Sequence, residues 1–131
     1  DAGVELNAKN PIMAVGNLSY VLSDPVLNKY FRFLLDQKIS MRYSGSLTVE
    51  IAHILSKRAG VFMYVVTTGK KKKLRLLYEC GPLAYIVEKA LGKSYDLNGS
   101  VLDAPVESLH QNIDFFLSDQ ILYDKFLEYY G

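Results

Sequence analysis

The chain has 131 residues, enough for one domain with a core of its own. Half of its residues are hydrophobic and 22% are charged, which excludes intrinsic disorder for most of the chain. With 15 Lys and Arg against 14 Asp and Glu, the net charge is +1, so no global field attracts nucleic acid or an acidic membrane. The longest apolar runs, such as residues 61–66, are far shorter than the roughly 20 residues of a membrane span.

The ends and the cysteine content indicate the setting of the domain. The first residues lack a basic segment followed by an apolar one, and they read like the interior of a longer protein rather than a secretory signal. A single cysteine, Cys80, excludes an intrachain disulfide and is typical of a reducing compartment. We therefore expect a cytoplasmic protein, with a plastid as the alternative.

Helical signals dominate the first half of the chain. The segment from Ser23 to Lys38 has an N-cap candidate in Ser23 or Asp24, Pro25 at an early position and apolar residues at i, i+3, i+4 and i+7, so it predicts a helix. The segment 46–59 repeats this apolar spacing and is followed by Gly60, which predicts a second helix.

Two strands and a third helix are expected next. The β-branched and aromatic run from Val61 to Thr67 and the run from Leu74 to Glu79 predict strands, joined by a hairpin-like turn at 67–70. Gly81 and Pro82 then open a helix with apolar residues at Leu83, Ile86, Val87 and Ala90, ended by Gly92.

The last part of the chain alternates turns and short strands before a final helix. A turn is expected at 98–99, a short strand at 101–104 and a firmer strand at 113–117. Ser118 or Asp119 caps the closing helix, whose buried face carries Leu122, Phe126 and Tyr129. Strands interleaved with helices predict an α/β layered domain with a mostly buried mixed sheet flanked by helices.

Two features could carry chemistry, and each has a structural alternative. The lysine run 70–73 is either a solvated turn or an anion site, in which Lys73, next to a strand, would be fixed and could join Asn17, Arg42, Tyr43 and Tyr64. Glu79, between a strand and a helix, is either a ligand for a hard metal such as Mg²⁺ or a surface capping carboxylate. His53, His110 and Cys80 are expected to be structural, and the sequence contains no zinc spacing, Walker loop, Rossmann fingerprint or nucleophile elbow.

Several motifs together resemble one enzyme family. Residues 73–85 read KLRLLYECGPLAY and continue to EKA at 88–90, while residues 42–46 read RYSGS, 101–103 read VLD and 109–111 read LHQ. These closely resemble the C-terminal signature of fructose-1,6-bisphosphatases and sedoheptulose-1,7-bisphosphatases, enzymes of carbohydrate metabolism in gluconeogenesis and the Calvin cycle. The resemblance covers residues 16–131, so the expected fold is the C-terminal half of a sugar phosphatase.

The resemblance implies a set of roles for residues of this chain. It places Glu79 as an Mg²⁺ ligand beside the phosphate that is removed, and Arg42 in the pocket of a neighbouring subunit of a homodimer or homotetramer. Leu47 would pack on the sugar. The residues implied to line the pocket for the distal phosphate are Asn17, Tyr20, Tyr43, Tyr64 and Lys73.

The resemblance also implies a substrate and a missing part. Three segments, 16–18, 38–43 and 64–73, are more similar to the sedoheptulose enzymes. Two others, 77–80 and 109–111, are more similar to the fructose enzymes. The resemblance therefore favours hydrolysis of the C1 phosphate of sedoheptulose 1,7-bisphosphate, with fructose 1,6-bisphosphate as the alternative substrate. The family's Asp-Pro-x-Asp-Gly metal motif is absent from the sequence. We therefore expect residues 1–131 to be a C-terminal sugar-phosphate-binding domain that is inactive without its N-terminal metal-binding half. A non-catalytic sugar-phosphate-binding or assembly module is the other alternative.

Overall fold

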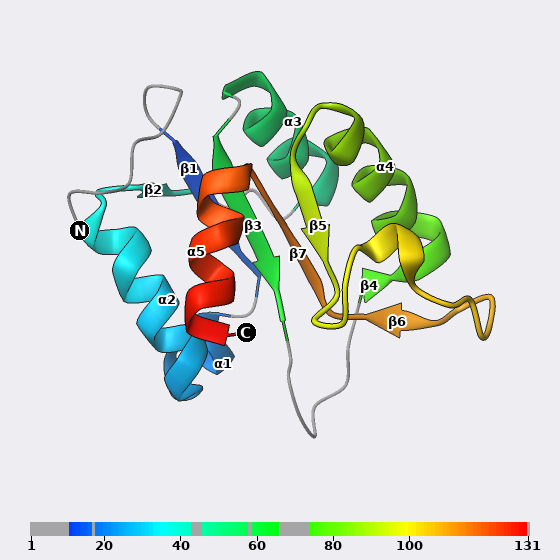
Figure 1. The fold of residues 1–131 in the computed structure, drawn as a ribbon, viewed down its shortest axis with the longest axis horizontal. Coiled ribbons are helices and arrows are strands. Elements are labelled where there is room, and N and C mark those ends of the chain that lie inside the picture. Colours follow the sequence, from blue (N-terminus) through cyan, green and yellow to red (C-terminus); the bar gives the residue numbers. More distant parts are fainter. Residues whose placement is uncertain (1–10, 17, 43–45, 58, 66–73, 131) are drawn as a thin grey trace.

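A computed structural model describes residues 11–16, 18–42, 46–57, 59–65 and 74–130. They form three layers, with a five-stranded sheet between two layers of helices (Figure 1). The predicted α/β class with a mixed, mostly buried sheet is therefore confirmed. Among the helices that these residues form, none is both long and apolar enough to cross a bilayer.

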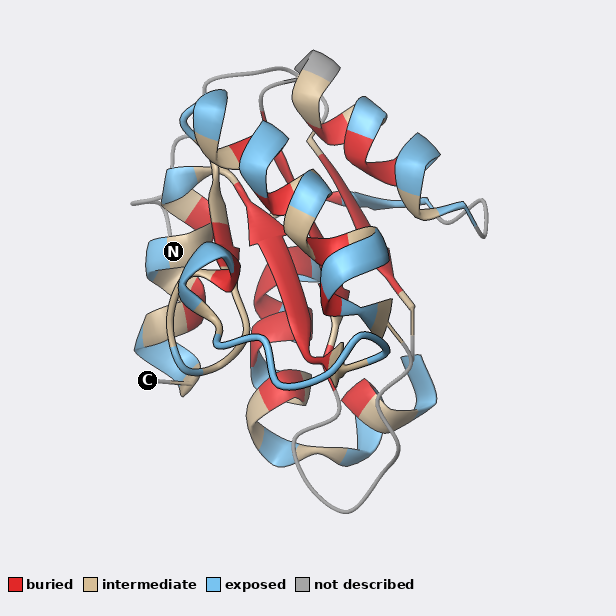
Figure 2. Cartoon of the chain, turned by 90° about the vertical axis from the view of Figure 1, so that its right-hand side faces the viewer, coloured by how far each residue is buried: buried red, intermediate tan, exposed pale blue. Residues whose placement is uncertain are grey.

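The sheet has the strand order β2-β1-β3-β7-β5. Its parallel part consists of β2 (Ser40–Met41), β1 (Ile12–Val15) and β3 (Gly60–Tyr64), and its antiparallel part adds β7 (Phe115–Ser118) and β5 (Lys93–Tyr95). All four residues of β1 and of β7 are buried, so both faces of the central strands are covered (Figure 2). Covered strands of this kind read as continuous apolar runs, which is the pattern of residues 61–66 and 115–117.

The two faces of the sheet have separate cores. Helices α2 (Pro25–Asp36) and α5 (Gln120–Tyr130) cover one face, and their core contains the stacked rings of Phe116 and Phe126, 4.2 Å between centroids. Helices α3 (Leu47–Lys57) and α4 (Gly81–Lys89) cover the other face, where Phe62 and Phe115 lie. We call these the α2/α5 core and the α3/α4 core. Alternate residues of β1 belong to different cores, as the two-residue period of a strand requires.

Local signals account for the helices that the sequence predicted. The Asp24 carboxylate accepts hydrogen bonds from the backbone N–H groups of Val26 and Leu27, both at 3.0 Å, and Pro25 occupies the first turn, so α2 begins as predicted. The Asp119 carboxylate accepts from the Leu122 N–H at 2.9 Å and so caps α5, and it also accepts from the Gly60 N–H of β3 at 2.9 Å. The cap therefore ties a helix to the sheet.

The prediction of a strand over 74–79 is wrong in length and partner. The strand β4 spans only Leu74–Arg75 and pairs with β6 (Asn112–Ile113) in a separate two-stranded sheet, not with β3 in a hairpin. Residues Leu76–Cys80 form a π-helical turn, η1, in which the Gly81 N–H donates to the Leu76 carbonyl. The helix started by Pro82 thus extends back over an apolar stretch that resembles a strand in composition.

Other differences concern short elements. Residues 101–104 were predicted as a strand, but Val101–Asp103 form a 3₁₀ turn, η2, because the Ser100 hydroxyl accepts from the Leu102 N–H at 3.1 Å. The predicted strand 113–117 is divided between β6 and β7 at Asp114. The strands β1, β2 and β5 and the short helix α1 (Leu18–Ser23) were not predicted. In α4, Ile86 lies outside the buried face, with an exposed fraction of 48%.

Candidate functional site

The parallel strands β1 and β3 end at the same edge of the sheet. Val15 pairs with Met63, and the N–H of Gly16 donates to the Met63 carbonyl at 3.0 Å, so Gly16 lies level with Tyr64, the last residue of β3. The carboxyl ends of parallel strands are where α/β proteins hold their ligands. In Figure 1 this is the edge toward which the arrowhead of β3 points, and α1 lies next to it.

Tyr64 is half-buried at this edge, and its ring lies directly on the backbone of Gly16. A Cβ atom built on Gly16 would be 2.2 Å from Cδ2 of Tyr64. The ring also packs against the α3/α4 core, together with Leu47, the first residue of α3, and with Leu74. Two predicted binding residues, Tyr64 and Leu47, are thus brought to one core although 17 positions separate them in the sequence.

The other predicted residues are placed differently. Tyr20, in α1 just beyond the end of β1, packs against the α2/α5 core, on the opposite face of the sheet from Tyr64. Arg42 follows the edge strand β2, its N–H donates to the Met13 carbonyl at 2.8 Å, and its side chain is exposed. Because β1 separates β2 from β3, the structure does not bring Arg42 next to Tyr64. Asn17, Tyr43 and Lys73 lie outside the described residues.

Residues 112–118, which contain β6 and β7, connect the two sheets at this edge. Tyr64 pairs with Phe115 of β7, and Leu74 pairs with Ile113 of β6. The partners of Tyr64 and Leu74 are two residues apart, a spacing of about 7 Å along a strand. The residue before Leu74 in the sequence is Lys73, so the strand pairing anchors the segment that follows Lys73 close to the end of β3.

Glu79 lies in the π-helical turn η1, about one third exposed. Its Oε1 atom accepts a hydrogen bond from the Arg75 N–H at 2.9 Å and lies 3.8 Å from Nε of Arg75. The capping contact that the sequence offered as the alternative is therefore present. Turns of π-helix are frequent at functional sites because they re-aim a side chain within a helix.

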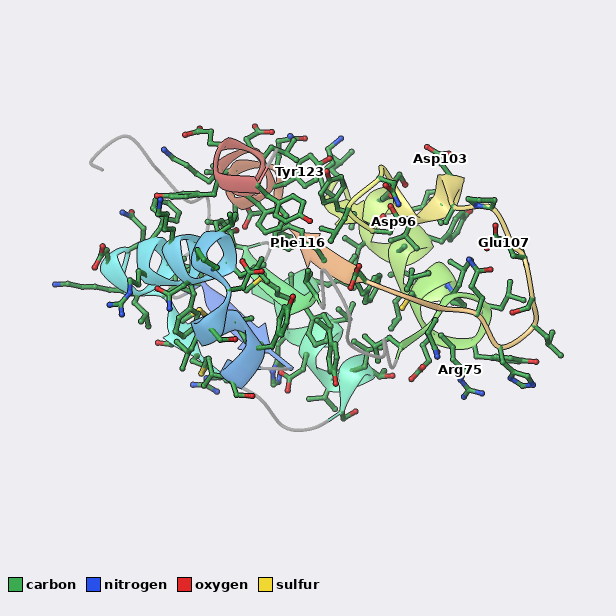
Figure 3. All side chains as sticks on the ribbon, turned by 90° about the horizontal axis from the view of Figure 1, so that it is seen from below. Arg75, Asp96, Asp103, Glu107, Phe116 and Tyr123 are labelled. Carbon is green, nitrogen blue, oxygen red and sulfur yellow. The ribbon has the colours of Figure 1, made fainter. Side chains whose placement is uncertain are left out.

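The side chain of Arg75 lies on the ring of Tyr78, which in turn stacks on His110, and sequence reasoning included neither ring in the site. Its guanidinium carbon lies 4.8 Å from the ring centroid of Tyr78, and the Tyr78 ring stacks on His110 at 5.8 Å. Figure 3 shows Arg75 at the end of the molecule that carries Glu107, away from Tyr123 of α5 and from Phe116. The i, i+4 spacing of Arg75 and Glu79 was the available signal, because an ion pair at this spacing is a common helical contact.

Mg²⁺ prefers several oxygen ligands in octahedral geometry, and the described residues offer few of them in one place. Within the described ranges no three His, Cys, Asp or Glu side chains come close enough to hold a metal ion. Glu79 alone has the chemistry of a ligand there, so any Mg²⁺ site would need further oxygen ligands. Cys80, fully buried, is no substitute: burial, with a smaller contribution from Glu79, raises the pKa of its thiol, which stays protonated as the predicted packing residue.

The fold defines an α/β domain with a candidate ligand site at the carboxyl ends of its parallel strands, and comparison with known proteins identifies its family. Residues 6–130 match the family model described as "Fructose-1-6-bisphosphatase, C-terminal domain". The chain belongs to this family, as its motifs predicted.

The similar proteins are of two kinds, named sedoheptulose-1,7-bisphosphatase and fructose-1,6-bisphosphatase. The chain is 35% identical over 96 residues to a chloroplastic sedoheptulose-1,7-bisphosphatase of Triticum aestivum, covering 73% of this chain and 24% of the relative. It is 36% identical over 121 residues to a class 1 fructose-1,6-bisphosphatase of Acaryochloris marina, covering 86% and 36%. The fructose-1,6-bisphosphatase of Leishmania major in its T-state is similar in structure, with a TM-score of 0.80, 31% identity, and coverage of 92% of this chain and 38% of that one. The chain thus spans between a quarter and somewhat over a third of the length of these proteins.

Proposed function

We propose that this chain is the sugar-phosphate-binding C-terminal domain of an Mg²⁺-dependent sugar bisphosphatase that hydrolyses the C1 phosphate of sedoheptulose 1,7-bisphosphate. The observation that carries the proposal is the half-buried Tyr64 at the carboxyl end of β3, which packs against the same core as Leu47 in a chain of this family. A tyrosine hydroxyl donates to a phosphate oxygen without adding charge.

In this proposal the distal phosphate is held by neutral donors and fixed cations. Tyr20, Tyr64, Asn17 and Tyr43 supply the neutral donors, and Lys73 supplies the charge within the subunit. Arg42 is exposed at the outer edge of the sheet, which supports a role toward the pocket of a neighbouring subunit in a homodimer or homotetramer. A guanidinium can make a bidentate hydrogen bond to phosphate, so the position of Arg42 would set the orientation of the sugar.

Glu79 is proposed to hold Mg²⁺ at the other end of the substrate. When bound, the metal supplies charge stabilisation and orients the attacking water. The contribution of this chain is to aim one carboxylate: the Arg75 N–H fixes Oε1, and the ring of Tyr78 fixes the Arg75 side chain. The remaining ligands would come from an N-terminal half.

A surface for that half is available near η1. Exposed apolar side chains, including Leu77, Leu102 and Val106, line a hollow of about 280 Å³. Contiguous exposed apolar surface commonly marks an interaction site. The hollow is lined by Leu76, Leu77, Gly81, Pro82, Val101, Leu102, Ala104 and Val106.

The preference for sedoheptulose rests on sequence similarity in segments 16–18, 38–43 and 64–73, and fructose 1,6-bisphosphate is the alternative substrate. We place the enzyme in the cytoplasm, with a plastid as the alternative. The test of the substrate is kcat/KM of the intact enzyme for both bisphosphates. A preference for the fructose compound would overturn this part of the proposal.

A second candidate is a non-catalytic sugar-phosphate-binding or assembly module. In that case Glu79 serves only to accept the hydrogen bond from the Arg75 N–H. The deciding experiment is Glu79→Gln in the intact protein, which keeps shape but removes the charge that a hard cation needs. The enzyme hypothesis predicts a loss of rate by orders of magnitude with an unchanged Tm.

Glu128→Gln is the matched control for this experiment. Glu128 is 63% exposed in α5 and pairs with Lys125 at 3.3 Å, so the same chemical change there should leave the rate intact. A Glu79→Gln enzyme as active as the control would leave Glu79 with the capping role alone.

A further inference from the structure

The contact between Gly16 and Tyr64 has a consequence for substrate binding. The three atoms nearest to a Cβ on Gly16 all belong to the Tyr64 ring: Cδ2 at 2.2 Å, Cε2 at 2.7 Å and Cγ at 3.2 Å. The ring therefore occupies the volume that any other residue at position 16 would fill. No other glycine that the structure describes has a single side chain as the source of all its close contacts.

The backbone at Gly16 does not itself require glycine. Its φ lies outside the left-handed region, in contrast to Gly60, which combines φ of +145° with an Ile12 carbonyl 2.5 Å from its would-be Cβ. The bond from the Gly16 N–H to the Met63 carbonyl is available to any residue except proline. The reason for a glycine here is thus the ring of Tyr64.

Tyr64 is also held by the sheet and by the α3/α4 core. It is the last residue of β3, its backbone is paired with Phe115, and its side chain packs against the α3/α4 core, as Leu47 and Leu74 do. A side chain at position 16 would have to push the ring away from the end of β1, since the strand pairing holds the backbone. The phenol oxygen, at the far end of the ring, would move most.

We infer that Gly16 is a positioning residue: by lacking a side chain it lets the Tyr64 ring lie across the end of β1 and so fixes where the Tyr64 hydroxyl meets the sugar phosphate. The inference rests on the proposed function, because it takes Tyr64 as a ligand of the distal phosphate. It adds a residue that touches no substrate and acts through Tyr64. Its effect belongs to substrate binding and not to the chemical step.

The experiment is a double-mutant cycle in the intact enzyme with Gly16→Ala and Tyr64→Phe. Each single variant is expected to raise KM about tenfold or more, the range for a lost hydrogen bond to a charged group, with kcat within about a factor of two. The combined variant should have the KM of Tyr64→Phe alone, because the hydroxyl that Gly16 positions is already gone. An unchanged KM in Gly16→Ala, beside a raised KM in Tyr64→Phe, would overturn the inference and leave the proposed function standing. An unchanged KM in Tyr64→Phe would remove the proposed role of Tyr64 and the inference with it.

Gly92→Ala is the matched control. Its Cβ would meet Cγ1 of Val87 at 2.6 Å, a comparable crowding at the end of α4 without contact with Tyr64. This variant should keep the parental KM, and a tenfold rise there would show that crowding anywhere in the domain has the same effect, against the inference.

A stability measurement covers the case in which Gly16→Ala folds poorly. The loss of Tm caused by Gly16→Ala should disappear when Tyr64→Ala removes the ring. The same loss in both backgrounds would mean that the ring is not what Gly16 accommodates, and the inference would fail.

Discussion

Tyr30 offers a test of how the two helices on one face are joined. Its side chain is fully buried, and its hydroxyl donates to the Leu122 carbonyl at 2.8 Å, linking α2 to α5 across 92 positions of sequence. The substitution Tyr30→Phe keeps the ring and its edge contact with Phe126, 5.0 Å between centroids, and removes this hydrogen bond. At neutral pH we expect a loss of about 1 to 1.5 kcal/mol in the free energy of unfolding, the net value of one such bond.

At alkaline pH the same substitution should have a second effect, which stabilises the folded state and so opposes the loss of the hydrogen bond. Burial, followed by the charges of Asp119 and Tyr129, raises the pKa of the Tyr30 phenol well above its ordinary value near 10. Above about pH 10 the unfolded chain releases this proton and the folded chain keeps it, so stability falls as pH rises. At pH 11 this cost is on the order of 1 kcal/mol in the parent and absent in Tyr30→Phe.

The two effects oppose each other, so the stability advantage of the parent over Tyr30→Phe should shrink between pH 7.5 and pH 11. The assay is urea unfolding of both proteins at pH 7.5 and pH 11 under reducing conditions, followed by circular dichroism because the chain has no tryptophan. The other tyrosines with a raised pKa, Tyr123 and Tyr130, are common to both proteins and drop out of the difference. A stability difference that is the same at both pH values would refute the burial of this hydroxyl in the folded state.

The remaining predictions concern binding, activity and one cap. In the intact enzyme Lys73→Ala should weaken substrate binding by about 1.5 to 3 kcal/mol and Lys70→Ala by no more than a few tenths, measured as KM at fixed ionic strength; equal losses would mean a diffuse electrostatic attraction. The 131-residue chain alone should release negligible phosphate from either bisphosphate with Mg²⁺, so turnover of about 1 per second or more would contradict the need for an N-terminal half. Asp119→Ala removes the acceptor for both Leu122 and Gly60 and should cost about 2 kcal/mol of unfolding free energy; a loss under about 0.5 kcal/mol in urea titration would contradict the double role of this carboxylate.

Elements whose signals lie within one short stretch of the sequence could be predicted. The helix α2 is predicted by Asp24, Pro25 and a regular apolar stripe, all within one segment, and the start of α5 is predicted by Asp119. The strand β4 could not be predicted correctly in the same way. Its length is set by Ile113 and by the Gln111 carbonyl, which accepts from the Leu76 N–H at 2.8 Å, and neither partner is visible in the local pattern.

The same division holds for the candidate site. Tyr64 and Glu79 were singled out from their positions in the sequence and from the family resemblance, and Leu47 from the resemblance alone. The structure places Tyr64 and Leu47 at one core. The part that sequence reasoning missed, the contact of Gly16 with the Tyr64 ring, depends on two strands meeting in a particular register. A glycine without a turn pattern gives no local sign of the ring that it accommodates.

The segment from Asn112 to Ser118 explains how the two proposed ends of the substrate could be held at a fixed separation. Its first part pairs with β4, which leads directly into the turn that carries Glu79, and its second part pairs with β3, which ends in Tyr64. Ile113, Phe115 and Leu117 all belong to the α3/α4 core, so the segment is clamped along its length. Because close-packed cores resist deformation, the distance between carboxylate and phenol is set by this packing and not by a hinge. If the proposed function holds, the side chains that lie between the Glu79 carboxylate and the Tyr64 phenol must decide whether a six-carbon or a seven-carbon sugar fits. Substitutions that change the sugar preference should then fall among those side chains rather than in the core.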